Sequence, residues 1–319
     1  MVKHFDMDFR TVLQPQPHPG LITHRRGILT LGSCFADNIA ARLADDMFPV
    51  LQNPFGTLYN PGSVYQGASR IALGEHFDRR ELFEHLGRWR SWNCHTLLTD
   101  TDPDALTARL NDILDRARQF VGQAAVAILT FGTARVFRLK DSGRIVANCH
   151  KMPSDSFQRL LLNPDQCVMM INATIDALRR VNPDITVIMT VSPVRHLADG
   201  AHGNFISKAT LALAVEQALA DNDRTFYFPS FEIMNDDLRD YRFYADDMVH
   251  PSPQAIDYIY DRFAETYFDT ATRQLALEAR KISRRKQHRP TDTTDPAEFS
   301  RFQEETDRLE RQLLSRLRP

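Results

Sequence analysis

The stretch ILTLGSCFADNIAARL, residues 28–43, has the most informative pattern in this sequence. Its first four residues are apolar, Gly32 follows them, and Ser33 and Cys34 stand side by side before a segment with helical spacing. A short, continuously apolar run is typical of a strand buried on both faces of a parallel sheet. Ligands bind beyond the carboxyl ends of such strands. The stretch therefore predicts a strand, a turn and a helix, with Ser33 or Cys34 as a candidate nucleophile in the turn.

The rest of the chain repeats this alternation of strand and helix. Apolar runs indicate further strands at residues 126–131, 185–191 and, more weakly, 225–228. Helical patterns occur at residues 36–47, 103–121, 164–181 and 207–220. Alternating elements of these lengths predict an α/β fold with a parallel sheet. A segment rich in Gly, Pro, Asn and aromatic residues, at about 52–100, predicts an insertion over one end of the sheet.

We expect one domain over residues 1–275 and a charged helical extension over residues 276–319. In the extension, a basic segment and the break TDTTDPAEF precede an amphipathic helix at residues 300–317. Its narrow apolar stripe consists of Phe302, Leu309, Leu313 and Leu317. Because three turns of stripe are short for a coiled coil, we favour a helix docked on the domain over one that forms a homodimer.

Composition excludes several classes of protein. The formal net charge of −2 gives no electrostatic reason to expect a nucleic-acid partner. The four cysteines are far apart and include no CxxC pair, which argues against a zinc ribbon or a disulfide framework. Free thiols fit a reducing compartment.

The apolar segments of the sequence are short. Residues 1–20 contain no apolar segment of signal-peptide length, and no run approaches the roughly 18 apolar residues of a membrane span. We therefore expect a cytoplasmic protein without a membrane span.

Small and polar residues follow the other predicted strands as well. Gly132-Thr133-Ala134-Arg135 follows the second strand, and Ser192-Pro193-Val194-Arg195-His196 follows the third. Near the end of the domain, YADDMVHPSPQAIDYIY (244–260) places Asp247 three residues before His250, just ahead of a helix start. A carboxylate at that spacing can orient one imidazole nitrogen and leave the other to take a proton from a nucleophile.

Five separate stretches resemble those of the GSCFA family. They are LGSCFA (31–36), NPFGTLYNP (53–61), NCHKMP (148–153), TVSPVRH (190–196) and YADDMVHPS (244–252). The resemblance covers most of residues 20–275. That family is similar to the SGNH hydrolases, a superfamily of esterases and acyltransferases with a three-layer, flavodoxin-like fold. The resemblance implies such a fold here and a Gly-Asp-Ser-type nucleophile turn, a late Asp-x-x-His pair and an oxyanion hole.

By position, Asp247 and His250 match the late pair, and Gly132 matches the glycine of the oxyanion block. The superfamily places Asn two residues after that glycine, whereas this chain has Ala134. A replacement donor is expected from Thr133, from Asn60 or from a backbone N–H near Gly56 or Gly62. Loss of one such donor costs about a hundredfold or more in rate.

The nucleophile turn also departs from the superfamily. Aligning Gly-Ser-Cys with Gly-Asp-Ser makes Cys34 the nucleophile, whereas a turn one residue shorter makes it Ser33. A cysteine at a helix N-terminus is expected to have a lowered pKa, which favours Cys34. The alternative for Cys34 is a small buried apolar side chain.

Other polar residues are weaker candidates. His150, Lys151, Arg195 and His196 are expected near the pocket, where Arg195 could bind a carboxylate or phosphate of the substrate. The histidines lack metal-ligand spacing, so neither a metal nor another cofactor is expected.

We interpret the chain as an acyl-ester hydrolase or acyltransferase that acts on a small molecule or glycan through a covalent acyl-enzyme. The alternatives are a ligand-binding protein of the same fold without turnover and, less favoured, a metal-dependent hydrolase.

Overall fold

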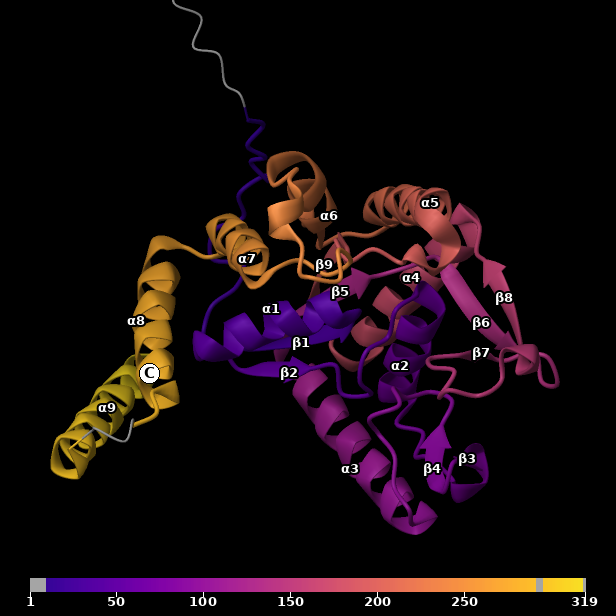
Figure 1. The fold of residues 1–319 in the computed structure, drawn as a ribbon, viewed down its shortest axis with the longest axis horizontal. Coiled ribbons are helices and arrows are strands. Elements are labelled where there is room, and N and C mark those ends of the chain that lie inside the picture. The colour runs from indigo at the N-terminus through magenta and orange to yellow at the C-terminus, as the bar shows by residue number, and fades with distance from the viewer. Residues whose placement is uncertain (1–9, 291–294, 318–319) are drawn as a thin grey trace, which may run out of the picture.

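The computed structural model describes residues 10–290 and 295–317. The first nine residues, part of the break predicted at 291–299 and the last two residues therefore lie outside the described chain. Five parallel strands form the central sheet in the order β2-β1-β5-β9-β10 (Figure 1). Their bounds are β1 Gly27–Gly32, β2 Val50–Gln52, β5 Ala124–Phe131, β9 Thr186–Val191 and β10 Thr225–Tyr227.

This strand order is that of flavodoxin-like sheets, and it reverses between β1 and β5. The predicted parallel sheet and four of its strands are therefore confirmed. The sequence reading missed β2, which pairs with β1 over only three residues. Such a strand is too short to show a periodic pattern.

Helices cover both faces of the sheet and make the fold three-layered. The long helices are α1 Cys34–Asp45, α2 Pro61–Leu73, α3 Pro103–Val121, α4 Pro164–Val181, α5 Gly200–Asp221, α7 Pro253–Tyr267, α8 Thr270–Gln287 and α9 Pro296–Leu317. A short helix, α6 Ser230–Glu232, follows β10. The four helical segments predicted from periodicity correspond to α1, α3, α4 and α5.

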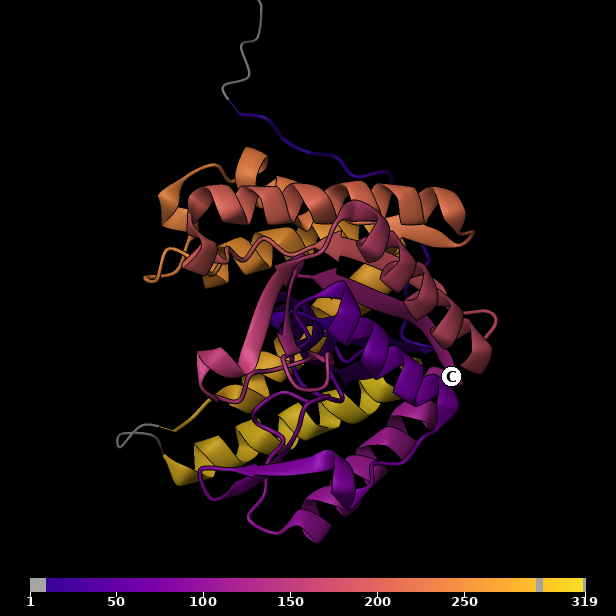
Figure 2. The ribbon, with the colours of Figure 1, turned by 90° about the vertical axis from the view of Figure 1, so that its right-hand side faces the viewer.

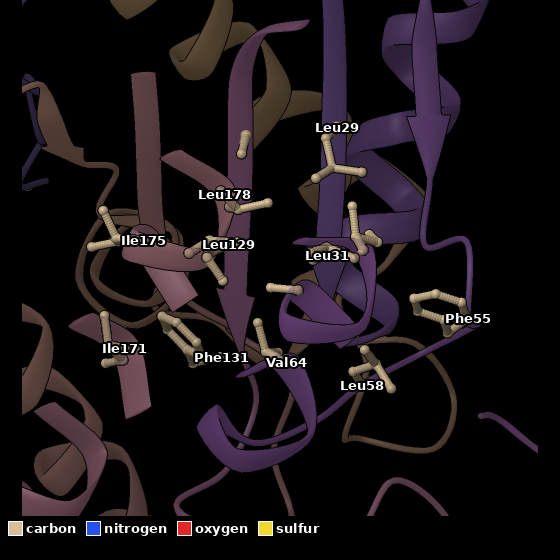
Figure 3. Packing of buried hydrophobic residues seen from close by; sticks show 14 of the residues in the cluster. Leu29, Leu31, Phe55, Leu58, Val64, Leu129, Phe131, Ile171, Ile175 and Leu178 are labelled. Carbon is tan, nitrogen blue, oxygen red and sulfur yellow. The ribbon is translucent and has the colours of Figure 1, made fainter. Parts of the chain in front are cut away.

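Successive side chains of β1 point to opposite faces of the sheet, and both sets include buried apolar residues, so helices must cover both faces. Ile28 packs with α1 and α7 residues in one apolar cluster, whereas Leu29 and Leu31 belong to the cluster beneath α2, α3 and α4. Figure 3 shows the second cluster, in which Leu31, Val64 and Ile171 come from β1, α2 and α4. Burial of these side chains from water is the main source of stability.

Two small antiparallel units extend beyond the central sheet. One is a hairpin of β3 Leu82–His85 and β4 Arg88–Ser91, within the segment expected as an insertion. The other is a sheet in the order β7-β6-β8, formed by β6 Arg135–Leu139, β7 Ile145–Val146 and β8 Phe157–Leu161. This second sheet lies at the right of Figure 1 and toward the viewer in Figure 2.

The C-terminal helices lie on the opposite side of the molecule from β6 and β8 (Figure 1). Arg280 of α8 forms an ion pair of 2.8 Å with the buried carboxylate of Asp46, so the expected boundary at residue 275 falls inside a helix tied to the core. Leu313 and Leu317 of α9 are buried against Ala279 and Ile282 of α8. The apolar stripe is thus covered within the chain, and a homodimer through α9 stays a prediction.

Among residues 10–290 and 295–317, no helix combines the length and the apolar character that crossing a bilayer requires.

Candidate functional site

A cavity of about 560 Å³ lies at the carboxyl ends of the central strands. Its walls come from the turn after β1, the loops after β5 and β9, the β6–β8 sheet and the loop before α7. This is the edge at which the strand order reverses and at which open α/β sheets bind ligands. Of the residues singled out from the sequence, those that line it are Cys34, Asn60, Thr133, Arg195, His196 and His250.

The turn after β1 requires glycine at its first position. Gly32 has φ of 148°, and a Cβ atom there would stand 2.2 Å from the carbonyl oxygen of Thr130. The Gly32 N–H donates to Oδ1 of Asn53 at 2.8 Å, which ties the turn to the chain after β2. The turn is therefore held by contacts on both sides of β1.

Ser33 and Cys34 occupy different environments in this turn. Ser33 is fully buried, it caps α1 by accepting the Phe35 N–H at its hydroxyl, and its own N–H donates to Thr130 O at 3.0 Å. Cys34 is the first residue of α1, it is partly exposed, and it lines the cavity. Ser33 is therefore a buried capping residue, whereas Cys34 is accessible to a ligand in the cavity.

The expected lowering of the Cys34 pKa is wrong. Burial, followed by the negative charge of Asp37, raises the pKa of the thiol above its ordinary value of 9.0. The backbone N–H groups of Cys34 and Phe35 and the ammonium group of Lys208 act in the lowering direction but are outweighed. The sequence indicates that Cys34 begins a helix, which lowers the pKa, but it does not show that the sulfur is removed from water, which raises the pKa. At neutral pH the resting cysteine is a thiol that needs a base to become a nucleophile.

Asp247 and His250 form the pair that their spacing predicts. Nδ1 of His250 lies 2.7 Å from Oδ2 of Asp247. Oδ1 of the same carboxylate accepts the N–H groups of Val249 and His250, each at 2.9 Å. These hydrogen bonds lower the pKa of Asp247 to about 2. The carboxylate therefore stays ionised and orients the imidazole, whose ring reaches the cavity from the α7 side.

The backbone N–H groups after β5 are already engaged. The Gly132 and Thr133 N–H groups both donate to the carbonyl oxygen of Tyr59, at 2.8 and 3.0 Å. The Thr133 hydroxyl lies 3.0 Å from the Ser207 hydroxyl and accepts the Arg135 N–H. This arrangement contradicts the expectation that the Gly132 N–H holds an oxyanion. The cause is a long-range contact with Tyr59 that the sequence does not reveal.

Asn60 offers a donor in their place. It caps α2, and its Oδ1 accepts the Ser63 N–H at 2.9 Å. That contact fixes the amide and leaves its Nδ2 group without an acceptor among the described residues. The side chain is 5% exposed and lines the cavity. Asn60 therefore presents an oriented N–H donor to a bound group.

Lys208 is the residue that sequence reasoning missed. It lies in α5, is 2% exposed, and its Nζ donates to the carbonyl oxygens of Gly132 and Ser192, each at 2.6 Å. Burial lowers the pKa of Lys208 to about 7, while the nearby Cys34 acts to raise it. The amine thus joins the ends of β5 and β9 behind the nucleophile turn. A lysine in a segment of small and apolar residues, SKATLALA, was the available signal.

His196 presents a second imidazole to the cavity. Its buried Nε2 has no hydrogen-bond partner among the described residues. That atom lies 3.1 Å from the position that a Cβ on Gly132 would take, and Ser33 Cβ lies 3.3 Å from the same position. Burial first, and then the positive charges of Lys208, His250 and Arg159, lower the pKa of His196 to about 4. His196 is therefore a neutral polar group beside the nucleophile turn.

Three sequence candidates lie away from the cavity. Gly56 has φ of 74° and packs against His95, which makes it a turn residue. His150 is buried, its Nε2 lies 2.9 Å from Ser91 O, and its ring meets those of Phe83 and Trp92 edge-on. Lys151 is exposed on the adjacent left-handed turn. The expectation that His150 and Lys151 line the pocket is wrong: His150 turns inward against the hairpin, and Lys151 faces solvent. The Gly56 N–H, expected as a candidate oxyanion donor, donates instead to Asn53 O at 2.7 Å.

Metal-ligating side chains do not gather in this region. Within the described part of the chain, no three His, Cys, Asp or Glu side chains are grouped as the ligands of one metal ion would be.

A family model supplies the identification. The model described as the GSCFA family matches residues 27–263. The chain belongs to the GSCFA family. The matched segment contains every residue that lines the cavity, from Cys34 to His250. A comparison with curated proteins found no match.

Solved structures of similar architecture include two esterases. A carbohydrate esterase family 3 protein from Talaromyces cellulolyticus has 9% identity and a TM-score of 0.37, and the match covers 79% of this chain and 99% of that one. An acetyl xylan esterase from the rumen bacterium Butyrivibrio proteoclasticus has 12% identity and a TM-score of 0.38, covering 76% of this chain and 63% of that one.

Proposed function

We propose that this GSCFA protein is an ester-bond hydrolase or acyltransferase that forms a covalent acyl-enzyme on Cys34. One observation carries the proposal: Cys34 lines the same cavity as His250, and Asp247 orients that histidine. A nucleophile, a base and an orienting carboxylate are the parts of a catalytic triad. The buried capping position of Ser33 supports Cys34 over its neighbour. The substrate class that fits this cavity is a small molecule or a glycan bearing an acyl group.

The chemistry proceeds in two steps. As the Cys34 sulfur attacks the acyl carbon, His250 takes the thiol proton, because the raised pKa keeps the thiol protonated at rest. The tetrahedral intermediate then expels the alcohol, which receives that proton from His250, and a thioester remains on Cys34. Water or an acceptor hydroxyl attacks the thioester while His250 takes its proton. The C–S bond then breaks, the acyl group leaves as a carboxylic acid or a new ester, and His250 returns the proton to the Cys34 sulfur.

Two donors are proposed for the oxyanion. The Cys34 N–H stands at the first turn of α1, where no intrahelical acceptor exists and the helix dipole favours negative charge. The Asn60 Nδ2 group is the second, and it replaces the asparagine that the chain lacks at Ala134. Preorganised donors of this kind are each worth about a hundredfold in rate.

One observation favours a second candidate, a ligand-binding protein without turnover. Tyr59 O occupies both N–H groups that follow β5, so the part of the oxyanion hole expected there is closed. In that case the cavity would bind the same ligands, and Cys34 would form no adduct.

Hydrolysis of para-nitrophenyl esters by the wild type and by three variants distinguishes an enzyme from a binding protein without turnover. Cys34→Ala and His250→Gln are expected to remove activity. Cys149→Ala, which changes the other cysteine of the cavity, is the matched control and is expected to keep it. Equal hydrolysis by all four proteins, or none by the wild type, would favour the binding protein.

A further inference from the structure

Three arginines are among the residues that line the cavity, in addition to the proposed triad. Arg135 comes from β6, Arg159 from β8 and Arg195 from the loop after β9. In the antiparallel register Phe137 pairs with Arg159, so Arg135, Phe137 and Arg159 share one face of the small sheet. That face turns toward the cavity, which all three side chains line.

The charges of these arginines are only partly balanced. Oδ2 of Asp199 lies 3.0 Å from Nε of Arg135 and 2.7 Å from Nη2 of Arg159, so two guanidinium groups share one carboxylate. Arg195 has no carboxylate within ion-pair distance among the described residues, and its guanidinium lies 4.8 Å from the ring centre of Tyr244. Asp247 is engaged by His250, and the negative charge of Asp37 acts on Cys34. The three arginines therefore outnumber the one carboxylate that pairs with them, and Arg195 also lines the neighbouring pocket that contains Tyr244.

Asp199 also holds two of the arginines in place. Its side chain is 7% exposed, and it contacts one nitrogen of each guanidinium. A guanidinium has five N–H donors in a rigid fork, so other donors of both groups stay available. Arginine forks bind planar or tetrahedral anions with two hydrogen bonds, and such charged bonds are stronger than neutral ones.

Arg195 is placed close to the chemistry. Its backbone N–H donates to Val249 O at 3.1 Å, one residue before His250, and His196 follows it directly. An anion bound by Arg195 would thus lie beside the loop that carries the proposed base. The apolar side chains of Phe137, Val146 and Val194 cover other parts of the wall and suit a hydrocarbon portion of the ligand.

We propose that the ester or thioester accepted at Cys34 carries a carboxylate or phosphate group, which Arg195 binds together with the free donors of Arg135 and Arg159. That the ligand is an acyl substrate of Cys34 rests on the proposed function. The anion-binding site itself does not depend on turnover. A neutral acyl sugar would bring no negative charge to the three arginines, which have one carboxylate, Asp199, between them.

Alkylation of Cys34 by iodoacetate and by iodoacetamide tests the proposal. Both reagents present the same carbon to the sulfur, so their rate ratio is independent of the thiolate population. We expect the iodoacetate to iodoacetamide ratio at Cys34 to exceed that of a small free thiol by about tenfold. Arg195→Gln should return the ratio toward the free-thiol value. Arg138→Gln, which alters an arginine of β6 that does not line the cavity, is the matched control and should leave it unchanged.

Titration of the Cys34→Ala variant by calorimetry separates this inference from the proposed function. Binding of inorganic phosphate would identify a phosphate site, and binding of glutarate a carboxylate site, with glutaramide as the uncharged control. Anion binding that disappears on adding Arg195→Gln supports the inference even when the wild type hydrolyses no ester. An alkylation ratio at Cys34 equal to that of a free thiol, together with no anion binding, would overturn the inference. Faster hydrolysis of neutral esters than of matched anionic esters would also overturn it, but it would leave the proposed function standing.

Discussion

The nucleophile turn, residues 32–34, and the base loop, residues 244–250, meet at one cavity but differ in burial and in how their side chains are oriented. Gly32 and Ser33 are buried, and their N–H groups donate to Asn53 and Thr130, far away in the sequence. The side chains of Asp247 and His250 are 50% and 46% exposed, and among the described residues the carboxylate is hydrogen-bonded to Val249 and His250 alone. Contacts between distant segments therefore hold the backbone of both, but the orientation of the His250 imidazole is set by a carboxylate only three residues away.

The largest effect is expected inside the turn. Cys34→Ala should lower ester hydrolysis by at least about a thousandfold, because it removes the atom that attacks. Ser33→Ala should keep activity within about tenfold, since the Ser33 hydroxyl caps α1 and is buried. Steady-state kinetics on both variants measures the difference. If Ser33→Ala were the inactive variant, the proposed turn register would be wrong.

In the base loop we expect a large effect on rate and a small one on stability. His250→Gln and Asp247→Asn should each lower kcat by about a hundredfold to ten-thousandfold, as loss of a general base or its orientation does. The free energy of unfolding of His250→Gln should change by less than about 0.5 kcal/mol, because that side chain is half exposed. Asp246→Asn, an exposed neighbour, is the control. A drop in stability that matched the drop in kcat would mean that the loop is structural.

Lys208→Met, beneath the turn, should mainly change the free energy of unfolding, and the size of that change should depend on pH. The pKa of Lys208 is about 7 in the folded protein and its ordinary value is 10.5. Between these values the unfolded chain binds more protons, so raising the pH stabilises the folded wild type relative to the methionine variant.

From pH 7 to pH 9, the difference in free energy of unfolding should shift by about 2 kcal/mol in favour of the wild type. Urea denaturation at the two pH values measures it. A difference that did not change with pH would contradict the burial of a titrating amine at the strand ends.

The smallest effect concerns the two helix caps that flank the site. Ser33 accepts the Phe35 N–H at the start of α1, and Ser252 accepts the Ala255 N–H at the start of α7. Replacing either by alanine should destabilise the protein by about 1 kcal/mol. Thermal unfolding measures both. A loss at Ser33 several times that at Ser252 would show that the turn depends on its hydroxyl for more than capping.

Sequence predicted the parts of this molecule that depend on local patterns. Apolar runs and helical spacing located β1, β5 and β9 and the helices beside them, and the Asp-x-x-His spacing predicted the hydrogen bond between Asp247 and His250. These features depend on neighbours within a few residues.

The environment of the nucleophile could not be predicted in the same way. The pKa of Cys34 depends on desolvation and on Asp37 and Lys208, and the closure of the N–H groups after β5 depends on Tyr59 O. The β6–β8 sheet, which supplies Arg135 and Arg159, has strands of two to five residues with little alternation. Contacts between segments distant in sequence decide all of these features.

The measurement that tests the central claim most directly is the mass of the acylated protein. The wild type and the Ser33→Ala and His250→Gln variants are mixed with para-nitrophenyl acetate, quenched in acid and digested for peptide mapping. We predict one acetyl group on Cys34 as a hydroxylamine-sensitive thioester in the wild type and in Ser33→Ala, and a much slower acylation in His250→Gln. An acetyl group on Ser33, or acylation of Cys34 at the same rate without His250, would contradict the account.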